Sequence, residues 1–278
     1  MNDRADQLAA WRRVKGVSSL SRAALTTVLA FATLLPVAFL IALSISGEWF
    51  YPALQPGRWT DANWAVLGQN GAAVARAVWT STALALGTGC ISAVAGLLAG
   101  REIAMLSGPR RQIAVALAFL PVAIPPLALS IGLQYSFLRL GLGGRFAGVL
   151  FAHIVPALGY TTLFFIGIFA VFDSRVEDEA RSLGASPLDV LRRVTLPLLR
   201  RPLIEAFALG FLVSWAQVPL TLLIGQGLIT TLPLTLMSYV SAGQDHLAAT
   251  AGLMLTIPPL ALLLAAGVAV RRLKVVIA

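Results

Sequence analysis

The stretch that decides the fold is DEARSLGASPLDVLRRVTLPLL, residues 178–199. It is charged and helix-prone, yet it lies between two long apolar runs. Acidic residues suit the first turn of a helix, and Gly184 supplies the left-handed residue that commonly ends one. We therefore predict a first helix over residues 174–183. Its first turns should expose four charged side chains, those of Glu177, Asp178, Glu179 and Arg181.

A second helix start follows this glycine at once. Ser186 can act as the N-cap, Pro187 suits the first helical position, and Asp189 completes a capping-box pattern. An apolar stripe at helical spacing then follows, with Arg192 and Arg193 beside it, and Pro197 is expected to end the helix. The stripe consists of Leu188, Leu191 and either Val194 or Thr195. Because an exposed apolar stripe usually marks an interaction site, the segment is predicted to be a docking element.

The rest of the chain is typical of an all-α integral membrane protein. Of its 278 residues, 58% are hydrophobic and only 12% are charged, whereas soluble domains carry roughly a quarter charged residues. A membrane-spanning helix needs about 20 apolar residues. Six stretches meet this length and predict six transmembrane helices: Ala23–Ile45, Val74–Leu98, Ile113–Phe137, Phe146–Phe172, Ile204–Ile224 and Leu247–Val270. The first is longer than the apolar stretch of a typical signal peptide, so we expect it to be retained.

The basic residues predict the orientation of these spans. All of the 21 Lys and Arg residues except Arg58, Arg76, Arg139 and Arg145 fall on one side of the predicted membrane. The positive-inside rule then places both termini in the cytoplasm. This orientation predicts a division of the chain into five segments. They are a cytoplasmic segment (1–22), the first span (23–45), a periplasmic loop (46–73), a core of spans 2–6 (74–271) containing a cytoplasmic loop (174–200), and a cytoplasmic tail (272–278).

This loop resembles the cytoplasmic signature of permease subunits of bacterial binding-protein-dependent type I ABC importers. That signature reads E-A-A, three residues, G, nine residues, I-x-L-P. Here Gly184 is followed after nine residues by Val-Thr-Leu-Pro, ending at Pro197, and the triplet before it is Asp178-Glu179-Ala180. The triplet departs from E-A-A at two positions. The loop is also the last cytoplasmic loop of a chain with six predicted spans.

The resemblance implies a type I importer permease fold and a set of partners. These would be a dimer of cytoplasmic ABC ATPases, a second permease subunit of the same or a related chain, a substrate-binding protein, and lipid of the bacterial inner membrane. The helix after the glycine would be the coupling helix that sits on the ATPase. The coupling residues carried over from the family are Asp178, Glu179, Ala180, Gly184, Ser186, Leu188, Asp189, Leu191, Arg192 and Pro197.

Other functions find no support in the sequence. The only two lysines, Lys15 and Lys274, follow no glycine-rich turn, so the P-loop of an ATPase is absent. We expect no cofactor on this chain, with ATP and Mg²⁺ bound by the partner, and no catalytic or metal site. The net charge of +9 is spread between apolar runs rather than gathered on one face, which argues against nucleic acid. The single cysteine, Cys90, excludes an intrachain disulfide and is expected to be a small buried residue.

Polar residues inside the spans are candidates for the solute pathway, because such residues tend to face the interior of the bundle. These candidates are Gln134, Tyr135, Ser214, Trp215 and Gln217, whereas His153 is equally well explained as a packing residue. The general character of the chain is similar to the branch that serves polyamines, thiamine, iron and oxyanions. Two alternatives remain at this point: a secondary transporter or channel that works without ATP, and a membrane scaffold or sensor.

Overall fold

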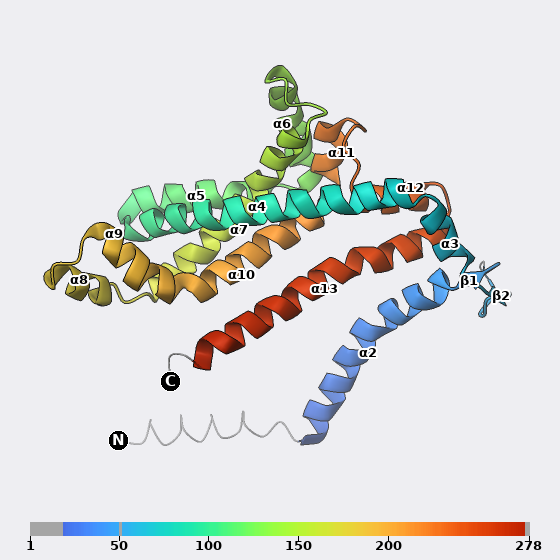
Figure 1. Ribbon diagram of the computed structural model, residues 1–278, viewed down its shortest axis with the longest axis horizontal. Helices are drawn as coiled ribbons and strands as arrows, with labels where there is room; N and C mark the ends of the chain where they lie inside the picture. Colours follow the sequence, from blue (N-terminus) through green and yellow to red (C-terminus); the bar gives the residue numbers. More distant parts are fainter. Residues whose placement is uncertain (1–18, 50–51, 276–278) are drawn as a thin grey trace.

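The computed structural model describes residues 19–49 and 52–275, and most of them are helical (Figure 1). The segment 1–18, with four of the predicted cytoplasmic basic residues, and the tail end 276–278 lie outside the described residues. The elements are α2 (Ser19–Ser44), β1 (Ser46–Gly47), β2 (Arg58–Trp59), α3 (Ala62–Gln69), α4 (Gly71–Met105), α5 (Gly108–Ala123), α6 (Pro126–Arg139), α7 (Phe146–Ala170), α8 (Arg175–Ser182), α9 (Pro187–Val190), η1 (Leu191–Thr195), α10 (Leu196–Trp215), α11 (Pro219–Gly225), α12 (Leu232–Ser241) and α13 (Asp245–Val275). The strands form one short antiparallel pair, with Ser46 opposite Trp59.

Four helices are long and apolar enough to cross a membrane by themselves. They are α2, α4, α7 and α13, whose most apolar windows have mean hydropathies between 1.8 and 2.3. Two further apolar segments are bent pairs: α5 with α6, at 102°, and the helix Pro187–Trp215 with α11, at 62°. The described residues therefore contain four candidate spans, or up to six if each bent pair is one span.

The prediction of single helices over 113–137 and 204–224 is wrong at these two bends. Pro125 and Pro126 follow α5, and Pro219 opens α11 after a break at residues 216–218. Proline lacks a backbone N–H and its ring clashes with the carbonyl four residues earlier, so it favours the start of a helix over its interior. Pro121 and Pro156, in contrast, lie inside helices α5 and α7. The loop after α11 contains the short helix α12.

Helices α4, α7 and α10 form the packed centre of the molecule. Small residues let their backbones approach: Gly96 of α4 lies against Thr161 of α7, and Gly89 of α4 lies against Phe207 of α10. The Thr161 hydroxyl also donates to the carbonyl of Ser92 at 2.7 Å. Close contact through glycine and hydroxyl groups is typical of helices packed in membranes.

Helices α13 and α2 lie beside this centre, with α13 next to α10 and α2 next to α13 (Figure 1). Every described side chain of α2 from Ala23 to Phe39 is exposed, although most are apolar. Helix α5 likewise has no buried residue. Cys90 is exposed on α4, so the prediction that it is buried is wrong. Exposed apolar helix faces on this scale are expected where lipid or another apolar surface covers the protein.

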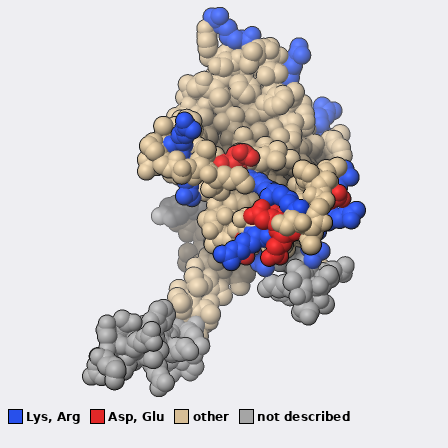
Figure 2. Space-filling model, turned by 90° about the vertical axis from the view of Figure 1, so that its left-hand side faces the viewer, with Lys and Arg blue, Asp and Glu red and all other residues tan. Residues whose placement is uncertain are grey.

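Charged side chains gather at the end of the molecule where α8 and α9 lie. Figure 2 views this end directly and shows the acidic groups lying beside arginine side chains. The opposite end of the helices carries α3, the strand pair and α12 (Figure 1). The predicted docking element therefore projects from one end of the helix bundle.

Candidate docking loop

Helix α8 ends as the sequence predicts, at a glycine with a positive φ. Gly184 has φ +88°, its N–H donates to the carbonyl of Arg181 at 2.9 Å, and the N–H of Ala185 donates to that of Ala180 at 3.1 Å. These two bonds form the Schellman motif, in which the last carbonyls of a helix are satisfied by the turn that ends it. The turn fixes the direction in which the chain enters α9.

Helix α9 starts with the predicted Ser186 N-cap, and Asp189 accepts the Ser186 hydroxyl rather than the backbone N–H of a full capping box. The Ser186 hydroxyl accepts the N–H of Asp189 at 3.2 Å and donates to its carboxylate at 2.6 Å. Pro187 occupies the first helical position, and Asp189 also pairs with Arg193 at 3.3 Å. Capping of this kind typically contributes about 1 kcal/mol to a helix.

Two leucines of α9 and η1 form an exposed apolar surface, as predicted. Leu188 is 52% exposed and Leu191 is 40% exposed, whereas Val190 between them is buried. We call Leu188 and Leu191 the docking face. Of the other predicted coupling residues, Glu179 and Arg192 are exposed at the same end of the molecule, and Asp178 pairs with Arg181 at 2.7 Å.

The prediction that Pro197 ends the second helix is wrong. The chain remains helical from Pro187 to Trp215 through the five-residue π-helical turn η1. In this turn the N–H of Leu196 donates to the carbonyl of Leu191, five residues earlier. The wider turn directly precedes Pro197, which cannot donate to the carbonyl of Arg193 in an ordinary helix. The docking face and α10 are therefore parts of one helical path.

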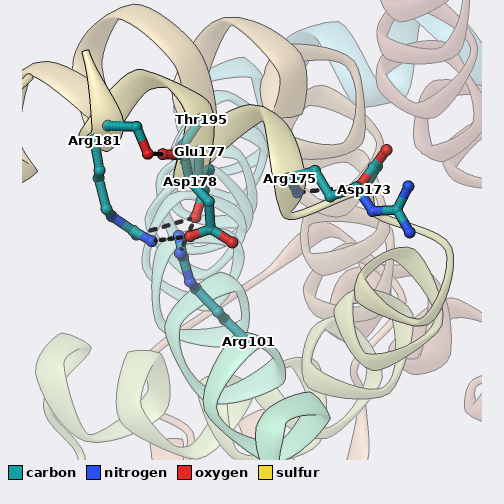
Figure 3. A network of polar contacts seen from close by, with 8 residues as sticks. Arg101, Asp173, Arg175, Glu177, Asp178, Arg181 and Thr195 are labelled. Atoms are coloured by element: carbon teal, nitrogen blue, oxygen red, sulfur yellow. Dashed lines mark hydrogen bonds and ion pairs between the residues drawn. The ribbon is translucent and has the colours of Figure 1, made fainter.

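The prediction that Glu177 is exposed is also wrong, and this residue is the one that the sequence reasoning missed. Glu177 is 2% exposed, and Figure 3 shows its carboxylate at the centre of a polar network. One oxygen accepts from Arg101 at 2.6 Å and from Arg181 at 3.4 Å, and the other accepts from the Thr195 hydroxyl at 2.5 Å. Thr195 is therefore buried in this network rather than part of the docking face.

The polar residues of the interior form a separate group around His153. Its ring nitrogens are hydrogen-bonded to the hydroxyls of Ser214, at 2.8 Å, and Thr221, at 2.9 Å. The group joins α7 to α10 and α11, on either side of the bend at residues 216–218. The side chains of Ser81, Leu84, Trp215, Gln217, Thr231 and Pro233 pack around this group and leave no space large enough for a water molecule.

The structure divides the predicted pathway residues between two places. Ser214, Trp215 and Gln217 lie around His153, but Trp215 is buried against Phe211 and donates its N–H to the carbonyl of Leu255 at 2.9 Å. Gln134 and Tyr135 lie on α6. Gln134 donates to the carbonyl of Leu223 at 3.5 Å, and the ring of Tyr135 is exposed. In this conformation the five residues do not form one continuous surface.

No metal site is evident in the part of the chain that the structure describes. Residues 19–49 and 52–275 contain no group of three or more His, Cys, Asp or Glu side chains placed to hold an ion. Three acidic side chains of the docking loop (residues 174–200) are instead paired with arginines: Glu177 with Arg101 and Arg181, Asp178 with Arg181, and Asp189 with Arg193. The pair between Glu177 and Arg101 holds the loop against α4.

Comparison with known proteins places this architecture in a family. The model of the family described as "Binding-protein-dependent transport system inner membrane component" matches residues 92–275. A protein of Salmonella typhimurium named as a 2-aminoethylphosphonate transport system permease, PhnV, is 31% identical over 216 residues, which cover 76% of this chain and 78% of the relative. The molybdenum transport system permease ModB of Mycobacterium tuberculosis is 32% identical over 211 residues, covering 69% and 79%.

Solved structures share the fold. A chain of a bacterial ABC transporter involved in import of the acidic polysaccharide alginate aligns with a TM-score of 0.67 at 16% identity, over 95% of this chain and 99% of that one. A chain of the MetNI methionine ABC transporter, in an inward-facing conformation, aligns with a TM-score of 0.59 at 18% identity, over 72% and 95%. The family match covers most of this chain and includes the docking loop. The chain therefore belongs to the binding-protein-dependent transport system inner membrane components, the permease family of ABC importers.

Proposed function

We propose that this chain forms half of the translocation pathway of an ATP-driven importer and that its docking loop binds the cytoplasmic ATPase. The observation that carries the proposal is the docking face. Leu188 and Leu191 are exposed on a helix whose start is capped and whose direction is fixed by Gly184. An apolar surface held this rigidly loses little conformational entropy when a partner covers it.

We infer the orientation of the chain from the same end of the molecule. The basic residues that the positive-inside rule places in the cytoplasm include those of α8 to α10, where the docking loop projects. A cytoplasmic docking loop is required if its partner is an ATPase that uses cytoplasmic ATP. Both termini would then be cytoplasmic, and β1, β2, α3 and α12 would lie on the periplasmic side.

A second permease subunit, of the same or a related chain, is proposed to complete the pathway. Helix α5 has no buried residue, and α2 exposes a continuous apolar surface. Lipid would cover part of this surface, and the second subunit would cover the part that faces the pathway. The proposed arrangement also includes a substrate-binding protein on the periplasmic side.

The proposed solute is a small molecule delivered by that binding protein. The relatives are named for 2-aminoethylphosphonate, for molybdenum and, in a protein of Haemophilus influenzae 28% identical over 48% of this chain, for spermidine and putrescine. These names span oxyanions and polyamines, two of the classes that the sequence suggests, with thiamine and iron as the others. The side chains around His153 carry hydroxyl, amide and apolar groups, without Asp, Glu, Lys or Arg, and in this conformation they leave no space for a solute.

The proposal is tested by placing charge on the docking face. In the double variant Leu188→Glu/Leu191→Glu, complex formation would bury unpaired carboxylates, at a cost of several kcal/mol. A loss of about 3 kcal/mol weakens association roughly 100-fold, since each 1.4 kcal/mol is about tenfold. The measurement is co-purification of the ATPase with the tagged chain from its own membrane, together with the ATP hydrolysis of the purified complex.

A matched control places the same two charges away from the docking loop. Leu140 and Leu228 are exposed on the loops that follow α6 and α11, so Leu140→Glu/Leu228→Glu should leave the ATPase bound. Membrane yield of all variants reports on folding. Normal ATPase association in the Leu188→Glu/Leu191→Glu variant would contradict the docking role. If the parent chain held no ATPase, a transporter without ATP or a membrane scaffold would be favoured instead.

A further inference from the structure

Helix α8 is anchored by a charged residue rather than by an apolar one. Of its eight residues, only Glu177 is buried. Short amphipathic helices usually bury an apolar stripe, because burial of apolar surface is their main source of stability. The position of α8 on the bundle is therefore decided largely by the partners of one carboxylate.

The two nearest of these partners belong to two different helices, α4 and η1 (Figure 3). Arg101 lies near the end of α4 and donates to the carboxylate at 2.6 Å, and Thr195 at the end of η1 donates to the other oxygen at 2.5 Å. Arg181 of α8 itself is more distant, at 3.4 Å, and its side chain is half exposed. Glu177 thus ties the loop to α4 and to the start of α10.

Helix α4 extends from this contact to the opposite end of the molecule. It passes the interior polar group, where Ser81 and Leu84 lie beside His153. The guanidinium of Arg101 also lies 5.9 Å from the centre of the Phe169 ring, at the end of α7. Arg101 therefore connects the loop to two of the three central helices.

We propose that Arg101 and Glu177 are positioning residues that make the docking loop and α4 move as one body. Separating the two groups would leave a buried carboxylate without its main counter-ion, which is strongly unfavourable. A displacement of the loop is then passed to α4, and through α4 to the interior of the bundle. This inference rests on the proposed docking function for its role in transport, but the rigid link itself exists with or without a partner.

The link is tested by measuring the distance between α8 and α4. Spin labels are placed on Ser182→Cys and Glu102→Cys, two exposed positions, in the full chain with the exposed Cys90 replaced by serine. In the parent we expect one narrow distance distribution, which is unchanged when MgATP and vanadate are added to the ATPase complex. Glu177→Gln keeps the shape of the side chain but removes its charge. We expect it to broaden the distribution in the isolated chain and to make it respond to nucleotide in the complex.

Three further variants separate positioning from a merely structural effect. Arg101→Gln should broaden the distribution as Glu177→Gln does, and Arg101→Lys, which keeps the charge, should restore a narrower one. Glu205→Gln removes the same charge from the exposed pair with Arg201, at 2.9 Å, and should change nothing. ATPase association should stay within a factor of about two of the parent in all of them, because the docking face is intact.

The outcomes for the link and for docking are distinct. Narrow, nucleotide-independent distributions in both Glu177→Gln and Arg101→Gln would overturn the link, whether or not the ATPase binds. Broadening in the isolated chain, together with an intact docking face that fails to hold an ATPase, would support the link and contradict the proposed function. Equal broadening in Glu205→Gln would show a general loss of structure and would also overturn the link.

Discussion

The central helices and the docking loop are both closely held, but by opposite means. Helices α4 and α7 touch through backbone and small side chains, as where Gly96 lies against Thr161. Helix α8 meets the bundle through the single carboxylate of Glu177 and its hydrogen-bonded partners. Packing without voids resists even small changes of shape. An ion pair also resists separation, but it requires that both groups stay charged rather than that their shapes fit closely.

This difference suggests a division of work within the molecule. A centre fixed by shape can transmit movement without deforming, whereas a loop fixed by charge stays attached to that centre only while its ion pair is intact. Membrane helices gain little from the hydrophobic effect between one another, so close packing is their main means of association. The loop lies outside the apolar zone, where arginine–carboxylate pairs are available. Three substitutions test whether shape or charge holds each of these two regions.

Gly96→Ala should have the largest effect, because it tests whether the centre is fixed by shape. A Cβ atom added at Gly96 would meet the backbone of Thr161, 2.9 Å from its carbonyl carbon. Since neither backbone can move alone, we expect a loss of about 1–3 kcal/mol in stability, as for other overpacked cores. Thermal unfolding of the purified chain in detergent measures the loss.

The matched control is Gly167→Ala in α7, where an added Cβ meets no atom within 4 Å. Alanine favours helix over glycine by roughly 0.5–1 kcal/mol, so this variant should be neutral or slightly stabilised. If Gly96→Ala unfolded at the parent's temperature, the centre would have more freedom than its packing indicates.

Ser186→Ala should have an intermediate effect confined to the loop. The substitution removes the side-chain oxygen that accepts the N–H of Asp189, and loss of an N-cap typically costs about 1 kcal/mol. A free-energy loss of about 1 kcal/mol corresponds to a factor of roughly five in an equilibrium constant. Backbone amides of residues 189–191 should therefore exchange with deuterium roughly fivefold faster. Ser182→Ala, which removes a hydroxyl bonded only to the carbonyl of Asp178 within α8, is the control. Equal exchange in both variants would show that the cap does not hold α9 in place.

Glu205→Gln should have the smallest effect on stability. Its pair with Arg201 joins two partly exposed side chains one turn apart on the same helix. Exposed pairs of this kind contribute about 0.2–1 kcal/mol, and salt screens them. Unfolding temperatures of the variant and the parent, measured at low and at high salt, should differ slightly at low salt and converge at high salt. A loss as large as that of Gly96→Ala would mean that charge also fixes the bundle.

Much of the fold follows from the sequence, because it depends on local signals. The apolar runs place the long helices, Gly184 marks the end of α8, and Ser186 with Asp189 marks the start of α9. The family resemblance, which rests on the spacing from Gly184 to Pro197, is confirmed by the family match. The docking role of these residues stays a prediction.

The errors share a different physical origin. The partner of Glu177 lies 76 residues away along the chain, and no local pattern predicts a contact at that distance. The bends after α5 and α10 arise where prolines coincide with a change in packing, whereas Pro156 in α7 lies inside a continuous helix. The same residue type thus gives a break in one place and none in another. Only the surrounding contacts distinguish the two outcomes.

The π-helical turn η1 determines the angle, around the helix axis, between the exposed face of α9 and the buried face of α10. Leu188 and Leu199 are eleven residues apart, and in a regular α-helix they would lie about 20° apart on the same side. The extra residue of the π turn rotates one part relative to the other by about 100°. Leu199 is therefore buried in the bundle while Leu188 faces outward. A single inserted residue therefore sets the direction of the exposed face of the helix independently of the part that is packed in the bundle.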